Sequence, residues 1–509
     1  MALALLLVAC GSPQHPEPSP SDVPPNEVSA VDIPAGRVDD AIHKLDGLVA
    51  DLMKSSGIPG MAVAVVHDGE VAYVKGFGVT DVRTGAKVDA DTVFQLASLS
   101  KPVGATVVAH EVTDGTVAWD TPVSAKLGWF ALSDPYVTRN ATIADLYSHR
   151  SGLPDHAGDL LEDLGYDRRQ VLERLKYLPL APFRITYEYT NFGVTAAAEA
   201  VAAAAGKPWD VLCDEELYRP LGMASTSSRF ADYESRKNRA VGHVKTPNGY
   251  QPLYTRNPDA QSPAGGVSSS INDMARWLTL MLANGTYNGI RITSPEALLP
   301  TVTPQVISVP AAKPSARASF YGHGFNVSVT SSGRPQYSHS GAFALGAGTA
   351  FAVLPSADVG LIALTNAAPI GVPETLAAEF LDLVQYGEIR ENWTALYREA
   401  FDGMDKPEGS LVGKQPPVGA VRPRPLNTYV GEYASPYWGP ARVTEANGAL
   451  QLSIGPRGSF PLTHWDGDTF TFAVQSENAP PGTISKASFD GNTLTLEYFD
   501  SDKLGTFTR

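Results

Sequence analysis

The order of strand-like and helical segments along the first 400 residues is the strongest constraint on the fold. Apolar segments with the length and pattern of strands lie at both ends of this region, whereas residues 92–284 are mostly helical in pattern. The strand-like segments are residues 61–66, 70–77, 337–343, 348–354 and 359–365. Segments so far apart share one sheet only if the two ends of the region meet, with the helical part as an insertion. We therefore predict an α+β fold around one antiparallel sheet.

Turn and helix signals agree with this prediction. Asp68-Gly69, between the first two strand-like segments, is a hairpin signal. Apolar residues recur at helical spacing within 38–53, before the hairpin, and within 376–384, after the last strand. We expect these helices to flank the sheet.

The composition changes after Phe401. Residues 406–425 contain five prolines and three glycines, which is typical of a linker. Short strand-like segments separated by turns such as Asn447-Gly448 then continue to the end of the chain, which predicts a small all-β sandwich or barrel, and we expect the barrel. The predicted domains are a signal at 1–11, a tether at 12–36, the α+β domain at 37–400, a linker at 401–425 and the barrel at 426–509.

The first residues predict a lipid-anchored protein. An apolar run at residues 2–9 is too short for a membrane span and ends at Cys10. Residues 7–10 resemble the bacterial lipobox, in which the cysteine is lipidated, although no Lys or Arg precedes the run. The Pro- and Ser-rich residues 12–34 would hold a domain away from the membrane. We expect a bacterial cell-envelope protein facing the periplasm or exterior; the alternative is an apolar N-terminus without this function.

Charge and cysteine content exclude several classes of partner. The formal net charge is −15, which argues against nucleic acid as a partner. The chain has two cysteines, so no disulfide framework stabilises it, and we expect Cys213 to be buried in a helix. We find neither His and Asp residues at metal-ligand spacing nor a nucleotide-binding glycine loop, and we predict no metal and no cofactor.

Ser98 and Lys101 form a Ser-x-x-Lys motif at a predicted helix start. A spacing of three places both side chains on one helix face. A serine hydroxyl needs a nearby base to become a nucleophile, and a desolvated lysine with a lowered pKa can be that base. A single Ser-x-x-Lys also occurs by chance in long chains.

Two further groups of residues suit the same chemistry. Tyr189 and Asn191 lie in a polar stretch about 90 residues on, where a phenol near an ammonium would ionise more easily and an amide could bind a substrate carbonyl. His339 and Gly341 lie on a predicted strand, and glycine lets a substrate backbone approach closely. The N–H groups of Ser98 and Ala342 could then form an oxyanion hole.

Together, the three motifs resemble those of the penicillin-binding protein and class C β-lactamase superfamily of serine hydrolases (peptidase S12 type), whose members carry Ser-x-x-Lys, Tyr-x-Asn and Lys-Thr-Gly or His-x-Gly in this order. Residues 146–153 and 263–277 are similar to two other signatures of the family. The resemblance covers about residues 37–390 and implies a β-lactamase/transpeptidase-like fold.

The resemblance also implies roles for individual residues. Ser98 would be acylated, Lys101 and Tyr189 would move protons, and Asn191, Gly341 and Ala342 would bind substrate. His339 would take the place of the family's lysine. We interpret His149 as structural, and Arg150 and His156 as loop residues.

The third motif departs from the β-lactamase pattern and indicates a different substrate. Lysine offers a permanent charge to a carboxylate, whereas His339 is mostly neutral at pH 7, and Ala342 lacks a hydroxyl. Residues 425–509 resemble the lipocalin-type barrel that follows peptidase members of the family; the barrel could instead serve stability or assembly. We predict a hydrolase of amide bonds in peptides, including those with D-residues, or of esters. Alternatives are a carboxylesterase, a weak β-lactamase, a β-lactam-acylated sensor or an inactive scaffold, and the oligomeric state stays open.

Overall fold

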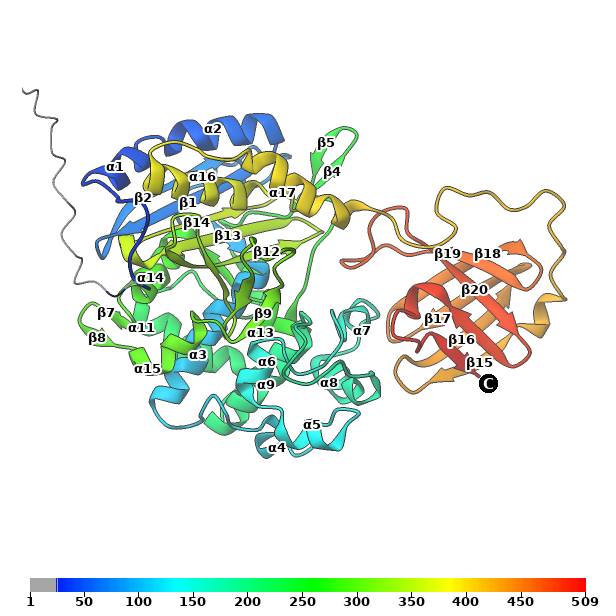
Figure 1. The fold of residues 1–509 in the computed structure, drawn as a ribbon. Helices are drawn as coiled ribbons and strands as arrows, with labels where there is room; N and C mark the ends of the chain where they lie inside the picture. Colours follow the sequence, from blue (N-terminus) through cyan, green and yellow to red (C-terminus); the bar gives the residue numbers. More distant parts are fainter. Residues whose placement is uncertain (1–23, 25) are drawn as a thin grey trace, which may run out of the picture.

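An eight-stranded antiparallel sheet forms the centre of the first domain in the computed structural model, which describes residues 24 and 26–509 (Figure 1). The strand order is β2-β1-β14-β13-β12-β11-β10-β9. These strands are β1 (Gly60–His67), β2 (Glu70–Gly78), β9 (Val306–Val309), β10 (Ser319–Tyr321), β11 (Asn326–Val329), β12 (Pro335–Phe343), β13 (Ala347–Leu354) and β14 (Val359–Thr365). The predicted α+β class with one antiparallel sheet is confirmed. Cys10 lies outside the described residues.

Strand β1 joins the two ends of the domain. It pairs with β2 through the Asp68-Gly69 turn and with β14, where Met61 lies opposite Thr365. Both residues of the turn have positive φ, as a type I′ hairpin requires. Nearly every residue of β1 is buried, and alternate side chains enter separate apolar clusters on the two faces of the sheet. Burial on both faces therefore fixes the register at the centre of the sheet.

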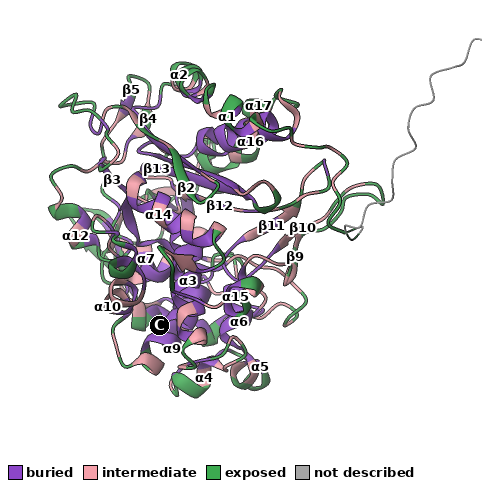
Figure 2. Ribbon diagram, turned by 90° about the vertical axis from the view of Figure 1, so that its left-hand side faces the viewer, coloured by how far each residue is buried: buried purple, intermediate pink, exposed green. Residues whose placement is uncertain are grey.

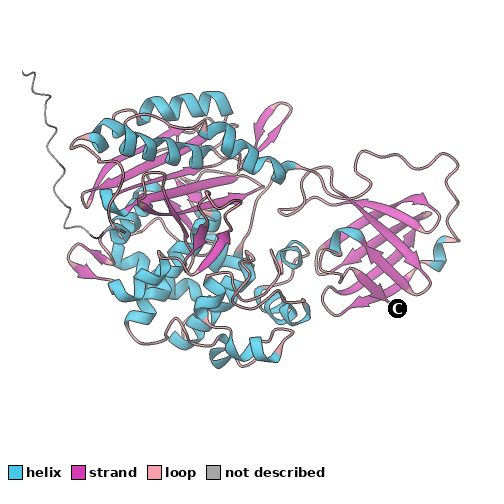
Figure 3. Cartoon of the chain, in the orientation of Figure 1, coloured by secondary structure: helices cyan, strands magenta, loops and turns pink. Residues whose placement is uncertain are grey.

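Helices cover both faces of the sheet (Figure 3). On the outer face lie α1 (Arg37–Ile42), α2 (Leu45–Ser56), α16 (Val372–Tyr386) and α17 (Trp393–Phe401). On the inner face, α14 (Ile271–Leu282) packs against β1 and β14. The single helix expected over residues 38–53 is two helices, because the chain turns at residues 43–44.

The helical region lies below the sheet in Figure 1 and contains the most buried helices of the domain. Figure 2 shows buried residues concentrated in the sheet and in α3 (Ser100–Thr113) and α9 (Asn191–Ala205). The shorter helices here are α4 (Val123–Lys126), α5 (Pro135–Asn140), α6 (Ile143–Tyr147), α7 (Asp159–Asp163), α8 (Arg168–Arg174), α10 (Trp209–Cys213), α11 (Arg219–Leu221), α12 (Phe230–Ser235), α13 (Ser262–Gly265) and α15 (Pro295–Leu298). As expected, Cys213 is buried, at the end of α10.

The helical region also contains short strands. The strand-like residues 93–96 before Ser98 predict one of them, whereas the sequence pattern does not predict the other five. The strands form two-stranded ribbons: β3 (Val93–Gln95) with β6 (Ser268–Ser270), β4 (Val244–Thr246) with β5 (Gly249–Gln251), and β7 (Thr286–Tyr287) with β8 (Ile290–Arg291). The β3–β6 ribbon matters for the site because it leads directly into the Ser98 turn.

The C-terminal domain is a closed eight-stranded barrel, as predicted. Its strands are β15 (Gly431–Ser435), β16 (Gly439–Ala446), β17 (Ala449–Ile454), β18 (Gly458–Asp466), β19 (Thr469–Ala473), β20 (Ile484–Asp490), β21 (Thr493–Leu496) and β22 (Thr506–Thr508). Buried aromatic side chains, among them Tyr433, Phe470 and Phe489, fill the barrel. Across residues 24 and 26–509, no helix combines the length and apolar character needed to cross a membrane.

Candidate functional site

Ser98 lies where the β3 strand turns into helix α3. It belongs to a short 3₁₀ turn, Ala97–Leu99, and the preceding Ala97 has a φ of 49°. A positive φ in a non-glycine residue is a strained conformation that the surrounding structure must hold in place. Lys101, in the first turn of α3, is fully buried, and its Nζ lies 3.0 Å from Ser98 Oγ. The Ser-x-x-Lys spacing therefore brings the two groups into direct contact.

Tyr189 and Asn191 reach the same point from the start of α9. The phenol of Tyr189 donates to Ser98 Oγ at 2.8 Å, and Lys101 Nζ donates to Asn191 Oδ1 at 2.6 Å. The ammonium of Lys101 also lies 4.5 Å from the centre of the Tyr189 ring. The predicted nucleophile, lysine, tyrosine and amide thus form one contiguous cluster.

The environment of Lys101 favours its neutral form. Its third hydrogen bond goes to the carbonyl of Ala264 at 3.1 Å, in the glycine-containing segment that forms α13. Burial lowers the pKa of Lys101 to about 7, while the negative charge of Asp159 acts in the opposite direction. A lysine with this pKa can accept a proton near neutral pH.

Tyr189 does not have the lowered pKa that the sequence argument expected. Burial raises the pKa of its phenol well above the usual value, and this outweighs the hydrogen bond to Ser98. Nearby tyrosine and aspartate side chains add to the increase. The phenol is therefore a hydrogen-bond donor to Ser98 in the resting site.

Strand β12 passes directly beside Ser98. A Cβ atom on Gly341 would overlap the carbonyl of Leu96 and the hydroxyl of Thr349, and would lie 3.1 Å from the Ser98 nitrogen. Thr349, on β13, donates to that Leu96 carbonyl at 2.7 Å. Glycine at 341 is thus required for β12 to reach the nucleophile turn, and it brings the following Ala342 to the edge of the site.

His339 is held by the protein itself. Its Nδ1 lies 2.6 Å from the carbonyl of Ser340, which can only accept, so Nδ1 carries the proton. Its Nε2 then accepts from the hydroxyl of Tyr321 at 2.8 Å. Burial and the charge of Lys101 lower the pKa of His339 to about 3, so the ring is neutral. Unlike a lysine at this position, His339 offers no positive charge.

His149 and Arg150 hold the loop around Tyr189. The Nδ1 of His149 accepts the N–H of Thr190 at 3.1 Å, and its ring packs 4.5 Å from that of Tyr189. Arg150 pairs with buried Asp145 at 2.9 Å. These contacts agree with structural roles for both residues.

Two acidic residues near the site were not singled out by the sequence argument. Asp159, at the start of α7, accepts a hydrogen bond from Asn191 Nδ2 at 2.8 Å. Glu477, in the loop between β19 and β20 of the barrel, accepts the N–H of Ala344 at 2.7 Å and that of Leu345 at 3.2 Å. Neither lies in a recognisable motif, because both contacts arise only when distant segments pack together.

A cavity of about 400 Å³ lies between the two domains beside this cluster. The first domain contributes His156, Asp159 and Ala344, and the barrel contributes Tyr437 and Glu477 among others. The barrel therefore forms part of the surroundings of the candidate site.

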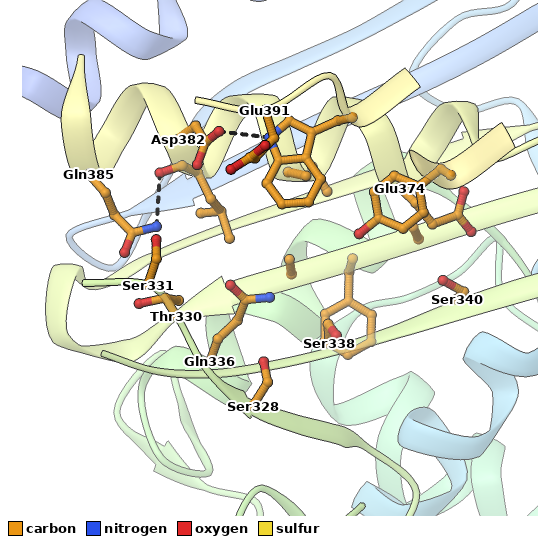
Figure 4. Close-up of a pocket in the computed structure, with 18 of the residues that line it drawn as sticks. Ser328, Thr330, Ser331, Gln336, Ser338, Ser340, Glu374, Asp382, Gln385 and Glu391 are labelled. Carbon is orange, nitrogen blue, oxygen red and sulfur yellow. Dashed lines mark hydrogen bonds between the residues drawn. The ribbon is translucent and has the colours of Figure 1, made fainter. Parts of the chain in front are cut away.

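A second pocket, of about 340 Å³, lies on the outer face of the sheet (Figure 4). Polar side chains of β11 and β12, including Ser338 and Ser340, face Glu374 and Asp382 of α16 across it. Ser98, Lys101 and Tyr189 are not among its lining residues, and of the predicted site residues it includes His339. Within residues 24 and 26–509, no cluster of three His, Cys, Asp or Glu side chains could hold a metal ion.

Relatives of known name resemble most of the chain. Unguisins hydrolase ungD' of Aspergillus campestris is 29% identical over 80% of this chain and 78% of its own length. Penicillin-binding protein 4 of Amycolatopsis lactamdurans is 30% identical over 61% of this chain and 81% of its own. The D-alanyl-D-alanine-carboxypeptidase/endopeptidase AmpH of Escherichia coli is 25% identical over 67% of this chain and 88% of its own.

A solved structure shares the fold of this chain, and two family profiles match its sequence. The octameric penicillin-binding protein homologue from Pyrococcus abyssi shares the fold, with a TM-score of 0.60 and 19% identity over 92% of this chain and 100% of that one. The domain of unknown function DUF3471 matches residues 415–502. The family described as Beta-lactamase matches residues 45–386, which is most of the chain. The chain therefore belongs to the β-lactamase family.

Proposed function

We propose that this protein is a serine hydrolase that cleaves amide bonds of peptides, including D-residue peptides, or ester bonds through an acyl-enzyme on Ser98. The observation that carries this proposal is the double contact on one hydroxyl: Lys101 Nζ at 3.0 Å and Tyr189 OH at 2.8 Å from Ser98 Oγ. A serine so placed has both a base and a proton donor within reach.

The proton path follows from the two pKa shifts. Ser98 Oγ attacks the substrate carbonyl and passes its proton to neutral Lys101, directly or through the Tyr189 hydroxyl. The proton then reaches the leaving group, whose bond to the acyl carbon breaks. Water attacks the ester on Ser98, its proton goes to Lys101, and Ser98 recovers a proton as the acid product leaves. Tyr189 accepts one proton as it gives up another, so its raised pKa is no obstacle.

The N–H groups of Ser98 and Ala342 are the proposed oxyanion hole. The close approach of Gly341 to the Ser98 nitrogen supports this assignment, because β12 and the nucleophile turn then border the same point. Loss of one such donor typically lowers kcat by about 10²–10³-fold.

The surroundings of His339 favour peptides and esters over β-lactams. Its ring is neutral and both nitrogens are bonded within the protein, so it provides no cation for a β-lactam carboxylate. The relatives of this chain include proteins named as a D-alanyl-D-alanine-carboxypeptidase/endopeptidase and an unguisins hydrolase. We expect kcat/KM for an ester or D-peptide to exceed that for a β-lactam; equal values would contradict this preference.

The direct test compares p-nitrophenyl acetate turnover by protein lacking residues 1–11 with that of its Ser98→Ala variant. Steady turnover that is lost in the variant is the expected result. A single stoichiometric burst would favour a sensor that stays acylated, and activity retained in Ser98→Ala would refute Ser98 as the nucleophile.

We also propose that Cys10 carries a lipid that anchors the protein in a bacterial cell envelope. The proposal rests on the residue pattern at 7–10 and the Pro- and Ser-rich segment that follows. In a bacterial host, the full chain should incorporate labelled palmitate and sediment with membranes. A Cys10→Ala variant that behaved identically would contradict the anchor.

A further inference from the structure

A chain of hydrogen bonds leads from Lys101 away from Ser98 into the helical region. Lys101 Nζ donates to Asn191 Oδ1 at 2.6 Å, and Asn191 Nδ2 donates to Asp159 Oδ2 at 2.8 Å. The same Asp159 oxygen lies 2.8 Å from His156 Nδ1. The nucleophile and its base are therefore connected to a carboxylate that touches neither of them by a hydrogen bond.

Asp159 determines which way the Asn191 amide faces. A carboxylate can only accept hydrogen bonds, so the amide must direct its NH₂ group towards Asp159. Its oxygen then faces Lys101, where it accepts from the ammonium. Without the carboxylate, the amide could rotate and direct its NH₂ group at Lys101, which would displace the lysine from Ser98.

Asp159 also places a negative charge close to Lys101. Its side chain is 3% exposed, and its second oxygen, Oδ1, has no hydrogen-bond partner among the described residues. Because Asp159 is nearly buried, its charge is screened less than that of an exposed carboxylate, which strengthens its interaction with the lysine. This charge favours the ammonium form, whereas burial favours the neutral amine.

His156 fixes Asp159 and also contacts Tyr189. Its backbone N–H donates to the carbonyl of Tyr189 at 2.7 Å, and its φ is 55°. Hydrogen bonding to Asp159, with the charges of Asp159 and Asp155, outweighs burial and raises the pKa of His156 to about 9. At neutral pH, the ring is therefore a cation that partly balances Asp159.

We propose that Asp159 is a positioning residue for the Ser98 reaction: it orients the Asn191 amide and supplies the charge that Lys101 faces, with His156 as its counter-ion. This inference rests on the proposed function. In this proposal, the start of α7 influences the position and the protonation of Lys101.

Other titratable groups surround these hydrogen bonds and must be considered when a pH profile is interpreted. Those that interact with Asp159 or Lys101 from neighbouring elements are Glu162, Tyr189, Tyr437, His149 and His339, whereas Asp155 interacts with His156 and Tyr189. Burial raises the pKa values of Tyr189 and Tyr437 and lowers those of His149 and His339, so these four stay neutral around pH 7. Glu162 is paired with Arg256.

The test measures kcat/KM for p-nitrophenyl acetate against pH in the full chain with Asp159→Asn. Wild-type activity should rise with pH through about 7, as Lys101 becomes neutral. In Asp159→Asn the rise should move to lower pH, because the ammonium loses its supporting charge, and the plateau should fall by about 10²-fold as the lysine loses its position. The rate of Ser98 labelling by a fluorophosphonate should follow the same profile.

Two further variants separate this role from general damage. Asp155→Asn makes the same charge change on an exposed neighbour without touching Asn191, and should leave the profile near that of wild type. His156→Gln removes the counter-ion, and should move the rise to higher pH, opposite to Asp159→Asn. Two outcomes would overturn the proposal. In the first, the pH at which kcat/KM rises is unchanged in His156→Gln and is unchanged or cannot be measured in Asp159→Asn. In the second, that pH moves equally in Asp159→Asn and Asp155→Asn. Turnover that survives Ser98→Ala would instead refute the proposed function.

Discussion

At the scale of single residues, the site divides two tasks between Lys101 and Tyr189. The lysine has a pKa near neutrality and can accept and release a proton, whereas the phenol stays protonated and donates a hydrogen bond to Ser98. Lys101 is 0% exposed, while Tyr189 and Ser98 are only half-buried. Substrate therefore meets the serine and the tyrosine first, with the lysine behind them.

Replacing Tyr189 with phenylalanine tests this division. The change removes the hydroxyl that donates to Ser98 but keeps the ring that packs against His149. We expect kcat for p-nitrophenyl acetate to fall by about 10²–10⁴-fold, with the unfolding temperature within a few degrees of wild type. Tyr187→Phe removes a phenol hydroxyl that makes no hydrogen bond to Ser98 from a ring that also packs against His149, and is the matched control. A loss of similar size in both variants would mean that the Tyr189 hydroxyl has no special role.

At the scale of secondary-structure elements, strand β12 serves both faces of the sheet. Alternate residues point to opposite sides, so Gly341 lies beside Ser98, whereas Ser338 and Ser340 line the pocket in Figure 4. The strand pairs with β11 over residues 335–338 and with β13 over residues 337–343. A shift of one residue in its register would exchange these two sets and remove the glycine from the site.

Gly341→Ala should damage both stability and activity. The added methyl group would overlap the Leu96 carbonyl and the Thr349 hydroxyl, so β12 must move away from Ser98. We expect the free energy of unfolding to fall by about 1–3 kcal/mol and turnover to fall by at least about 10²-fold. Urea unfolding and ester hydrolysis measure the two effects.

A glycine with free space around it provides the comparison. Gly47 lies inside α2 with no atom near its missing side chain, so Gly47→Ala should be neutral or slightly stabilising. Full activity in Gly341→Ala would show that the close approach of β12 to Ser98 is not required for turnover.

Helix α16 places Glu374 in the outer pocket, where burial raises the pKa of its carboxyl to about 7 from an ordinary value near 4.5. Between these two pH values, the unfolded chain releases this proton and the folded protein keeps it. Stability therefore falls as pH rises through this window, by up to about 3 kcal/mol. Glu374→Gln should remove this loss, so that its stability advantage over wild type grows from pH 5 to pH 8.

Unfolding temperatures at the two pH values measure the effect. Glu391→Gln changes an exposed carboxylate at the rim of the same pocket and is the control. If the two variants behave alike, Glu374 is not the group responsible.

In the large sheet, the sequence pattern predicted the long strands and missed the short ones. β1, β13 and β14 are almost wholly buried runs, so their pattern is clear. β9, β10 and β11 have three or four residues each, with half-exposed side chains, and their strand form depends on pairing at the edge of the sheet. In the same way, Ser98 and Lys101 share a motif, whereas Asp159 meets Asn191 only in the folded chain.

At the scale of the whole molecule, the barrel and the first domain share a hydrogen-bonded boundary. Glu477 binds the turn that follows β12, and Asn478 donates to Asp163 of α7 at 2.9 Å. The hydroxyl of Tyr166 donates to the carbonyl of Trp438 at 2.6 Å. The β19–β20 loop thus contacts both the turn after β12 and the helix that begins at Asp159.

Glu477→Ala should change substrate use more than stability. Its carboxylate side chain is 10% exposed and is the acceptor for two backbone N–H groups, so its loss would free the turn at residues 344–345. We expect kcat/KM for a peptide to fall by about 10-fold, consistent with a lost hydrogen bond to a charged group, and that for p-nitrophenyl acetate to change less.

Glu432→Ala removes an exposed carboxylate elsewhere on the barrel and is the control. Deletion of residues 405–509 extends the same test to the entire domain. If substrate preference, assembly and stability all survive the deletion, the barrel contributes neither to substrate selection nor to structural support.

The pairing of β1 with β14 has a consequence for synthesis of the chain. The centre of the sheet can form only after residue 365, which pairs with residue 61, has been synthesised. At about 5–20 residues per second, the ribosome needs roughly 15–60 s to supply the second strand. During this interval, the apolar strand β1 has no partner on the edge that later pairs with β14, which is the condition that favours association with other chains. We therefore expect the β1 segment to need protection from association, for example by a chaperone, until strand β14 has been synthesised.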